Sequence, residues 1–281
     1  MILKKYEPAD DIVSLEIYSP LIASKAKAGQ FVVIRANETG ERIPLTIADS
    51  DSAKGTINLT ILKRGKTTNL LSCMNEGEII KDIAGPLGKK SEIENFGNVI
   101  ILGGGVGIAP TLPIIKAMKR SGNHVISILG ARNREGLIFE EEIKKFSNEF
   151  YICTDDGSKG FKGFVSEFLS GYLKRESNKP INRVIAIGPA LMMRAVCEIT
   201  KPFNLKTIIS LNPIMVDGTG MCGSCRVEVS GKTKFACVDG PEFDGHLVDF
   251  KLLISRLNIY CEEEKESFNK YMENHECKMN M

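Results

Sequence analysis

The sequence predicts an antiparallel β-barrel, then an α/β domain with a doubly wound parallel sheet, and finally a small cysteine-rich segment. Up to about residue 90, short β-branched or alternating runs are separated by turn residues. From residue 97, nearly continuous apolar runs alternate with helical periodicity. Three of the eight cysteines then lie between Cys222 and Cys237. With 281 residues and 43% hydrophobic residues, the chain is long enough for two cores.

The barrel is expected over residues 1–96. Turns rich in glycine and polar residues punctuate this stretch, as is typical of small antiparallel barrels. The clearest runs with strand character are Ile12–Ile17, Gln30–Ile34, Gly55–Leu62 and Glu78–Ile83.

The α/β domain is expected over residues 97–210, because strands that are apolar throughout are typical of a parallel sheet buried on both faces. The five expected strands are Val99–Leu102, Val125–Leu129, Glu149–Thr154, Arg183–Ile187 and Lys206–Ser210. The helices expected between them are Thr111–Arg120, Phe139–Phe146, Gly163–Lys174 and Ala190–Thr200. A cysteine-rich segment follows over 211–247, and a helical tail over 248–281 has its helix around Cys261–Tyr271.

Charge and hydropathy exclude several classes of partner. The net charge of +2 gives no electrostatic reason to expect nucleic acid or an anionic membrane. The N-terminus lacks the apolar run of a signal peptide, and the chain contains no run of 18 apolar residues. We therefore expect a cytoplasmic protein, in which clustered cysteines indicate metal ligation rather than disulfides.

The cysteine spacing is that of a plant-type ferredoxin loop in which aspartate replaces the first cysteine. Asp217, Cys222, Cys225 and Cys237 are separated by four, two and eleven residues. This pattern predicts a 2Fe-2S cluster with these four residues as ligands. A zinc site is the alternative, although structural zinc sites usually have two C-x2-C pairs. Asp217 is a harder donor than a thiolate, so water or a more distant cysteine is the alternative fourth ligand.

The glycines of this loop are part of the same prediction. Four ligands converge on a small cluster only if the backbone winds tightly around it, with positive φ angles and N–H groups directed at sulfur. Gly218, Gly220 and Gly223 permit that winding.

Three groups of residues in the barrel predict a flavin site. An arginine offers forked donors to a pyrophosphate, and hydroxyl and backbone groups can bind the polar edge of an isoalloxazine ring. Seen alone, the second group is equally compatible with a solvated basic loop. The groups are Arg42, Pro44, Leu45 and Thr46 at the end of one strand; Leu62, Lys63, Arg64, Gly65, Thr67 and Thr68 after another; and the turn Gly85, Pro86, Leu87 and Gly88.

A glycine loop between a buried strand and a helix predicts nucleotide binding, with a purely structural turn as the alternative. Such a loop presents N–H groups and the helix dipole to a pyrophosphate. Its match to the dinucleotide fingerprint is partial. Two later strand ends open on the same edge of the sheet, where ligands of α/β domains bind. The candidates are Gly104, Gly105, Val106, Gly107 and Pro110; Thr154, Asp155 and Asp156; and Gly188, Pro189 and Met192.

These motifs, in this order, resemble the ferredoxin-reductase-like family over nearly the whole chain. Within that family the sequence is similar to electron-transfer subunits with a C-terminal cluster. They include the small (alpha) subunits of NADH-dependent reduced ferredoxin:NADP oxidoreductases, also called sulfide dehydrogenases, and the electron-transfer subunits of dihydroorotate dehydrogenases. The dihydroorotate type carries four cysteines in this loop, so Asp217 favours the first group.

The resemblance implies FAD on the barrel, NAD(H) on the α/β domain, and a cluster that faces a larger subunit with another flavin and 4Fe-4S clusters. This heterodimer would bifurcate electrons and reach ferredoxin through the complex, with the tail as a docking element. Hydride transfer depends mainly on positioning, so no catalytic side chain is expected. The alternatives are the dihydroorotate dehydrogenase subunit and a non-catalytic redox sensor. Arg132 and Arg134 leave NADP open as the nucleotide, although the resemblance favours NAD.

Overall fold

The N-terminal part is a six-stranded antiparallel sheet with strand order β1-β2-β5-β4-β3-β6. The computed structural model describes residues 1–175 and 180–279. Hydrogen bonds from Ile2 N to Glu78 O (2.9 Å) and from Gly77 N to Ile2 O (2.8 Å) bring the two ends of the sheet together, as expected of a barrel. Its elements are β1 (Ile2–Ala9), β2 (Ile12–Tyr18), α1 (Pro20–Ala23), β3 (Phe31–Arg35), β4 (Arg42–Asp51), β5 (Thr56–Leu62), α2 (Lys66–Cys73) and β6 (Asp82–Leu87).

Alternating apolar residues of the strands form the core of this barrel. Leu15 of β2 lies opposite Leu59 of β5, and Val13 lies opposite Ile61. These side chains are buried and form one cluster with β3 residues. Period-two alternation therefore directs one face of each strand inward, as the sequence predicts.

Two barrel strands differ from expectation. β6 begins at Asp82 rather than Glu78, and it includes the Gly85–Leu87 stretch that was expected to form a turn, because this stretch pairs with β3. Arg42 begins β4 instead of ending a strand, so Pro44 and Thr46 lie within the β3–β4 ladder.

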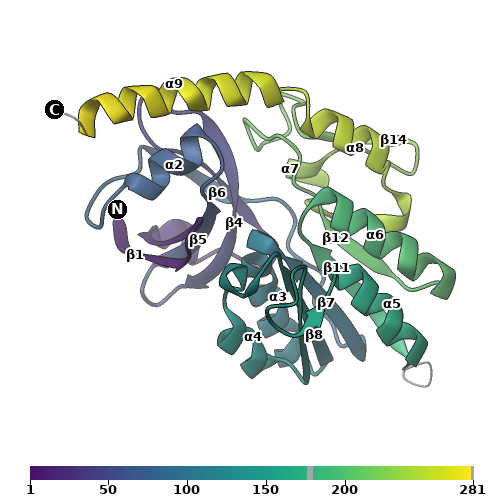
Figure 1. Ribbon diagram of the computed structural model, residues 1–281. Helices are drawn as coiled ribbons and strands as arrows, with labels where there is room; N and C mark the ends of the chain where they lie inside the picture. The colour runs from purple at the N-terminus through teal and green to yellow at the C-terminus, as the bar shows by residue number, and fades with distance from the viewer. Residues whose placement is uncertain (176–179, 280–281) are drawn as a thin grey trace.

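The second sheet has seven strands in the order β10-β9-β8-β7-β11-β12-β15, and it contains all five expected parallel strands. Helices cover both of its faces (Figure 1). The elements are β7 (Asn98–Gly104), η1 (Gly105–Gly107), α3 (Ile108–Arg120), β8 (His124–Ala131), η2 (Arg134–Gly136), α4 (Glu140–Phe146), β9 (Glu149–Thr154), β10 (Phe161–Lys162), α5 (Val165–Arg175), β11 (Ile181–Ile187), α6 (Ala190–Thr200), η3 (Lys201–Phe203) and β12 (Thr207–Ser210).

The C-terminal segment joins this sheet instead of standing apart. Its strand β15 pairs antiparallel with β12, with Ile209 opposite Phe243. Val227 and Leu253 enter the core beneath α5 and α6. The remaining elements are β13 (Arg226–Val229), β14 (Lys232–Phe235), α7 (Ala236–Asp239), β15 (Glu242–Asp244), η4 (Gly245–Leu247), α8 (Phe250–Leu257) and α9 (Cys261–Met279).

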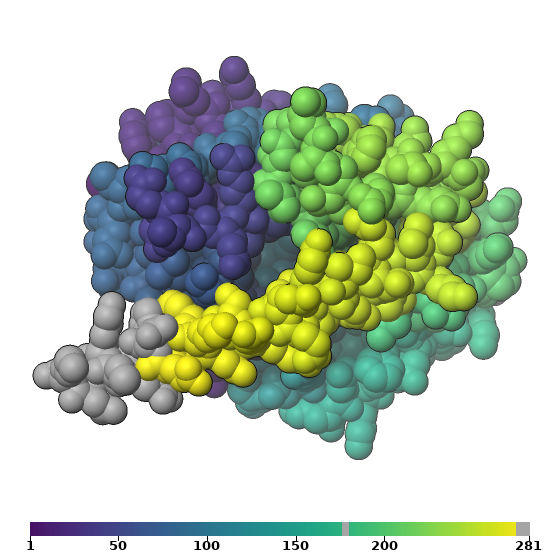
Figure 2. Space-filling view, turned by 90° about the horizontal axis from the view of Figure 1, so that it is seen from above, coloured from purple at the N-terminus to yellow at the C-terminus, as the bar shows by residue number. Residues whose placement is uncertain are grey.

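The tail forms the expected helix and turns back over the barrel. Figure 2 shows α9 stretching across this face from the C-terminal segment to the barrel, and in Figure 1 it runs alongside α2. Burial, followed by the Cys73 thiol of α2, raises the pKa of Tyr271. No helix among the described residues is both long and apolar enough to cross a membrane.

Candidate functional site

The β13–β14 hairpin brings Cys225 and Cys237 together. Arg226 pairs with Phe235 in that hairpin, so the residues just outside the pair, Cys225 and Ala236, are linked by a backbone hydrogen bond of 3.1 Å. Both thiols are buried and their Sγ atoms lie 3.2 Å apart. The hairpin is thus the structural reason for the eleven-residue spacing.

The loop before the hairpin winds as tightly as a cluster site requires. Gly218, Gly220 and Gly223 have φ angles of +82°, +88° and +70°. Asp217 Oδ2 accepts hydrogen bonds from the Thr219 hydroxyl, from Thr219 N at 3.0 Å and from Met221 N at 3.4 Å. These donors lower the pKa of Asp217, the Thr219 hydroxyl most of all. The carboxylate is therefore held ionised at the mouth of the loop.

The thiols of the loop occupy two different environments. Cys222 is exposed, and hydrogen bonds from Ser224 lower its pKa. Burial, followed by the adjacent Cys225 thiol, raises the pKa of Cys237 to about 12. One side of the loop thus offers a thiol that ionises readily, and the other offers a buried pair whose negative charge needs a cation to offset it.

The donor set fits an iron–sulfur cluster better than a single ion. Three thiols and one carboxylate come from one glycine-rich loop and its hairpin, and thiolates are the usual protein ligands of such clusters. Among the side chains that the structure describes, no group of three or more His, Cys, Asp or Glu residues is gathered around one point, so the structure brings Cys225 and Cys237 together without gathering all four predicted ligands.

The cysteine loop packs against the barrel. Cys225 and Cys237 share a buried cluster with Phe31 and Val33 of β3. Gly218 comes close to the barrel, since a Cβ atom there would lie 2.7 Å from Leu87 Cδ1 and 2.9 Å from Val33 Cγ2. The loop therefore lies directly on the strand that carries the third predicted flavin group.

The first flavin group lies on β4 beside this contact. Arg42 is exposed, and its positive charge contributes to the lowered pKa of Asp217 across the junction. Thr46 faces Phe31 in the β3–β4 register, and Pro44 faces Val33. Pro44, Leu45 and Thr46 are half-buried.

The second flavin group forms the N-terminus of α2, where hydrogen bonds already occupy most of its polar side chains. Thr68 Oγ1 accepts from Gly65 N at 2.9 Å and from Arg64 N at 3.0 Å, which caps the helix. Thr67 donates to Glu41 at 2.9 Å, and Lys63 pairs with Glu7 at 2.9 Å. Arg64 is exposed, whereas Leu62 is half-buried at the end of β5.

The turn group closes the junction between barrel and cysteine segment. Gly88 has a φ of +76°, and a Cβ atom there would lie 2.8 Å from Phe31 and 2.9 Å from Pro241. The Gln30 amide donates to Gly88 O at 2.8 Å. Gly85 and Pro86 are half-buried within β6.

The predicted nucleotide residues converge at the carboxyl ends of β7 and β11. A Cβ atom at Gly104 would lie 2.4 Å from Met192 Sδ, and one at Gly107 would lie 2.6 Å from Ile187 O. A Cβ atom at Gly188 would lie 2.8 Å from Met192 Cε. By contrast, nothing lies within 4 Å of a Cβ atom at Gly105, whose φ is +56°. The loop is therefore closely packed on the side of Met192 and β11 and open to solvent at Gly105, as the binding of a pyrophosphate requires. Val106 and Pro110 lie half-buried at the start of this turn and of α3.

At the carboxyl end of β9, Thr154 is hydrogen-bonded within the protein, whereas the two aspartates that follow are exposed. Thr154 is fully buried, and its hydroxyl donates to Lys159 O at 2.8 Å. Asp155 and Asp156 are exposed. Burial raises the pKa of Asp155 and outweighs the opposing charge of Arg132, whereas the Ser158 hydroxyl lowers the pKa of Asp156. Pro189 is exposed at the neighbouring strand end.

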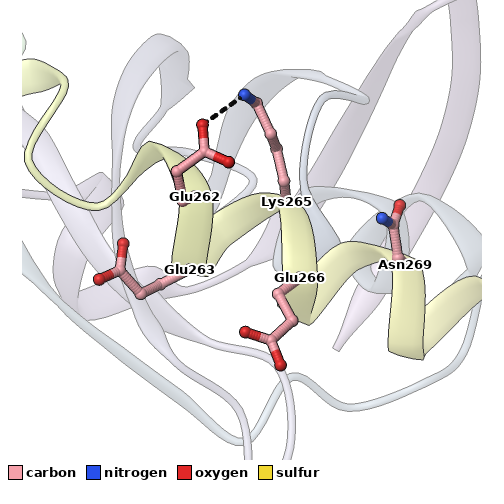
Figure 3. A pocket seen from close by; sticks show the side chains of 5 residues that line it. All are labelled: Glu262, Glu263, Lys265, Glu266 and Asn269. Atoms are coloured by element: carbon pink, nitrogen blue, oxygen red, sulfur yellow. Dashed lines mark hydrogen bonds and ion pairs between the residues drawn. The ribbon is translucent and has the colours of Figure 1, made fainter.

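One surface pocket lies away from all of these groups. It is lined by Glu262, Glu263, Lys265, Glu266 and Asn269 of α9 (Figure 3). Glu262 and Lys265 pair across one helical turn at 2.7 Å. All five residues are exposed on one helix, so we assign it no cofactor.

Sequence reasoning missed a buried polar group between the domains. Ser91, Arg183 and Glu242 come from a linker, β11 and β15. No local motif marks them, and Arg183 falls within a run read simply as a strand.

Two family models match the chain. Residues 212–249 match the iron-sulfur cluster binding domain of dihydroorotate dehydrogenase B, and residues 101–198 match the oxidoreductase NAD-binding domain. These matches coincide with the cysteine loop and the glycine loop.

Curated relatives cover almost the whole chain. A Thermotoga maritima protein, the dihydroorotate dehydrogenase B (NAD(+)) electron transfer subunit homolog, is 47% identical over 96% of this chain and 95% of its own length. A Methanocaldococcus jannaschii protein, a probable subunit of the same kind, is 34% identical over 80% of this chain and 81% of its own length.

A solved structure agrees equally well. A chain from the NADH-dependent reduced ferredoxin-NADP oxidoreductase, reported for flavin-based electron bifurcation, is 48% identical, with a TM-score of 0.91, over 96% of this chain and 97% of that one. Phthalate dioxygenase reductase, 19% identical with a TM-score of 0.58 over 81% of this chain and 85% of its own, shares the fold. These comparisons support the three expected cofactors, which are a 2Fe-2S cluster, NAD(H) and FAD. The chain therefore belongs to the dihydroorotate dehydrogenase B electron transfer subunits and their homologues, a ferredoxin-reductase-like family of oxidoreductase subunits.

Proposed function

We propose that this chain passes electrons between NAD(H) and a 2Fe-2S cluster through FAD, within an electron-bifurcating complex of the ferredoxin:NADP oxidoreductase type. The contact of Gly218 with Leu87 and Val33 supports this proposal most strongly, because it sets the cysteine loop against the barrel beside the flavin groups. A bound flavin exchanges hydride with nicotinamide and single electrons with a cluster, so the barrel belongs between the other two sites.

The residues divide the work of binding. Arg42 and the capped N-terminus of α2 offer charge and N–H donors for a pyrophosphate, and Thr46 offers a hydroxyl beside Phe31. The glycine loop at Gly105 receives the nucleotide, with Asp155, Pro189 and Met192 at the neighbouring strand ends. These groups orient the two cofactors, and we assign no side chain an acid or base role.

Exposed apolar residues around the cysteine loop fit a partner surface. Met221 is 85% exposed, Val216 45% and Val238 40%, and all three lie within a few residues of a predicted ligand. An electron-transfer subunit needs a partner close to its cluster, and apolar residues exposed at one place suit such a contact. We propose that a larger subunit with flavin and 4Fe-4S clusters binds here and connects the chain to ferredoxin.

NADH-driven reduction of a dye by the purified chain tests the oxidoreductase function. The proposed function predicts NADH-dependent bleaching of the flavin, followed by dye reduction. A non-catalytic redox sensor would bind flavin and cluster without this turnover. Absence of NADH-driven reduction in a chain loaded with FAD and iron would therefore favour the sensor.

Identification of the co-purifying subunit separates the two enzyme alternatives. The family model and the relatives' names favour the dihydroorotate dehydrogenase subunit, whereas Asp217 and the 48% identical structure favour the oxidoreductase. We expect untagged purification from the native host to yield a subunit with flavin and 4Fe-4S clusters. Recovery of an FMN barrel enzyme instead would establish the dihydroorotate dehydrogenase alternative.

Substitution of Asp217 tests the predicted ligand set. Asp217→Ala should lower iron content and alter the electron paramagnetic resonance spectrum of the reduced cluster, because it removes one donor. Asp239→Asn is a matched control, since Asp239 accepts from Phe235 N at 2.8 Å in the same segment without belonging to the set. Unchanged iron content and spectrum in Asp217→Ala would eliminate Asp217 as a ligand.

A further inference from the structure

The linker between barrel and α/β domain, residues 88–97, is tied to both domains and to the cysteine segment although it has no regular structure. Ser91 N donates to Ala28 O of the barrel at 2.8 Å, and Lys89 N donates to Gly240 O of the cysteine segment at 2.6 Å. The Ser91 side chain is buried. A connection held on several sides behaves as a fixed joint rather than a flexible tether.

One set of contacts ties the linker to the cysteine segment. Ser91 Oγ donates a short hydrogen bond to Glu242 Oε1 on β15, the strand that follows Cys237 and α7. The barrel leaves room for this bond only because position 29 is glycine. A Cβ atom at Gly29 would lie 2.2 Å from Ser91 Oγ and 2.9 Å from Glu242 Oε1. We call these three residues the serine arm.

A second set of contacts ties the linker to the α/β domain. Arg183 of β11 donates from Nη1 to Glu92 Oε2 at 2.8 Å, and its guanidinium carbon lies 3.6 Å from the centre of the Phe96 ring. Arg183 Nε is buried and has no hydrogen-bond partner in the described part of the chain. An unsatisfied buried donor is destabilising, and stacking on an aromatic face offsets this cost in part. We call these three residues the arginine arm.

We propose that the two arms position different parts of the α/β sheet and its attached segment against the barrel, the serine arm the edge strand β15 with the cysteine segment and the arginine arm the central strand β11. The inference rests on the proposed function, in which these parts exchange electrons with the barrel in separate steps. Electron transfer to the cluster depends on the position of the cysteine segment relative to the barrel. Hydride transfer depends on the position of the α/β domain relative to the barrel. Ser91, Glu242 and Arg183 are thus positioning residues, each for one step.

The two steps can be followed separately in the full chain loaded with FAD and iron. After mixing with NADH, flavin absorbance reports the first step, and electron paramagnetic resonance of rapidly frozen samples reports cluster reduction. We expect Ser91→Ala to slow cluster reduction at least about fivefold and leave the flavin step unchanged. We expect Arg183→Met to slow the flavin step by a similar factor, with the cluster keeping pace with the flavin.

Two further variants control for charge and folding. Arg194→Met removes an exposed ion pair with Glu198 on α6 (2.8 Å) and should slow neither step. Glu242→Gln keeps an acceptor for Ser91 and should retain the wild-type rate of cluster reduction. Hydrogen exchange supplies a readout independent of turnover, and it should rise at residues 240–244 in Ser91→Ala and along β11 in Arg183→Met.

The proposal is overturned if both arm variants slow the same step, if neither slows any step, or if both lose FAD and iron equally. Each of these results would mean either that the two arms act as a single structural unit or that they position neither part of the molecule. Failure of the wild-type chain to accept electrons from NADH would instead refute the proposed function, so the two failures are distinguishable.

Discussion

Two glycines of the C-terminal segment both have positive φ angles, but only one of them is crowded by neighbouring side chains. Gly218 and Gly231 both have positive φ angles, +82° and +68°. A Cβ atom at Gly218 would overlap Leu87 and Val33 of the barrel, whereas one at Gly231 would meet nothing within 4 Å. Both positions favour glycine for its backbone freedom, but only Gly218 needs it for a close approach.

Alanine at these two positions should therefore have unequal effects. Gly231→Ala should cost about 1–2 kcal/mol of the free energy of unfolding, from the left-handed backbone alone. Gly218→Ala should cost about 2–5 kcal/mol, because overpacking adds to that strain, and it should lower iron content. Denaturant unfolding and iron analysis measure both effects. Equal losses for the two variants would contradict close packing of the loop on the barrel.

Glu242 predicts a pH dependence of stability. Burial raises the pKa of this carboxyl above the usual 4.5, against the opposing effects of Ser91 and Arg183. The folded state then binds the proton more tightly than the unfolded state, so stability falls as pH rises above about 4.5 until the folded-state pKa is passed. Glu242→Gln lacks this titration.

Thermal unfolding of Glu242→Gln and wild type measures this effect. We expect the variant to gain stability relative to wild type as the pH rises above about 4.5. Arg183 and Glu92 face the same carboxyl and are common to both proteins, so the difference isolates Glu242. A difference that stays constant or shrinks with rising pH would show that the carboxyl pKa is not raised.

At the scale of elements, helix α9 is amphipathic. One face packs on the rest of this chain, and the other face is a candidate docking surface for a partner. Ser267, Phe268 and Tyr271 are half-buried at helical spacing, whereas Glu263, Glu266 and their neighbours are exposed. Tyr271 reaches Cys73 of α2, the helix whose N-terminus carries the second flavin group. The tail thus rests on the barrel and leaves its acidic and basic face available to a partner.

Alanine at neighbouring positions of α9 tests this arrangement. Tyr271→Ala should cost about 1–3 kcal/mol, because it removes a side chain packed on α2. Met272→Ala changes an exposed side chain on the adjacent position and should be nearly neutral. The melting temperature and hydrogen exchange along α9 measure both. A similar small effect of the two variants would mean that α9 does not depend on α2.

At the scale of the whole molecule, the cores explain how the cysteine segment is connected. The barrel core and the two cores of the α/β sheet are built mainly from residues outside this segment. The fourth core is shared between Cys225, Cys237 and the barrel residues Phe31 and Val33. The segment therefore depends on the barrel more than the barrel depends on it.

Removal of iron should consequently have a local effect. We expect chelation to raise hydrogen exchange over residues 212–241 and to leave β2, β5, β7 and β8 protected, because their cores contain none of the three cysteines of the predicted ligand set. NADH-driven bleaching of FAD should persist within about twofold of the holoprotein. Cooperative loss of FAD with the iron would show instead that the cluster stabilises the barrel.

Much of this protein could be predicted from the sequence because its signals are local. Period-two alternation predicts β2 and β5, apolar runs predict β7 and β8, and the spacing of Cys222, Cys225 and Cys237 predicts a cluster loop. The start of β6 and the place of Arg42 were predicted wrongly, since both depend on pairing with β3, which local residues do not encode.

The sequence by itself determined the order of the domains and the classes of cofactor, and it predicts a donor set with Asp217 in it, because each depends on residue type and spacing along the chain. Tertiary structure alone decided that β15 completes the nucleotide sheet, that Gly218 approaches Leu87, and that Ser91, Arg183 and Glu242 meet at the linker. The physical reason is that these contacts join residues far apart in the chain, and the closeness of such residues is set by how whole elements pack.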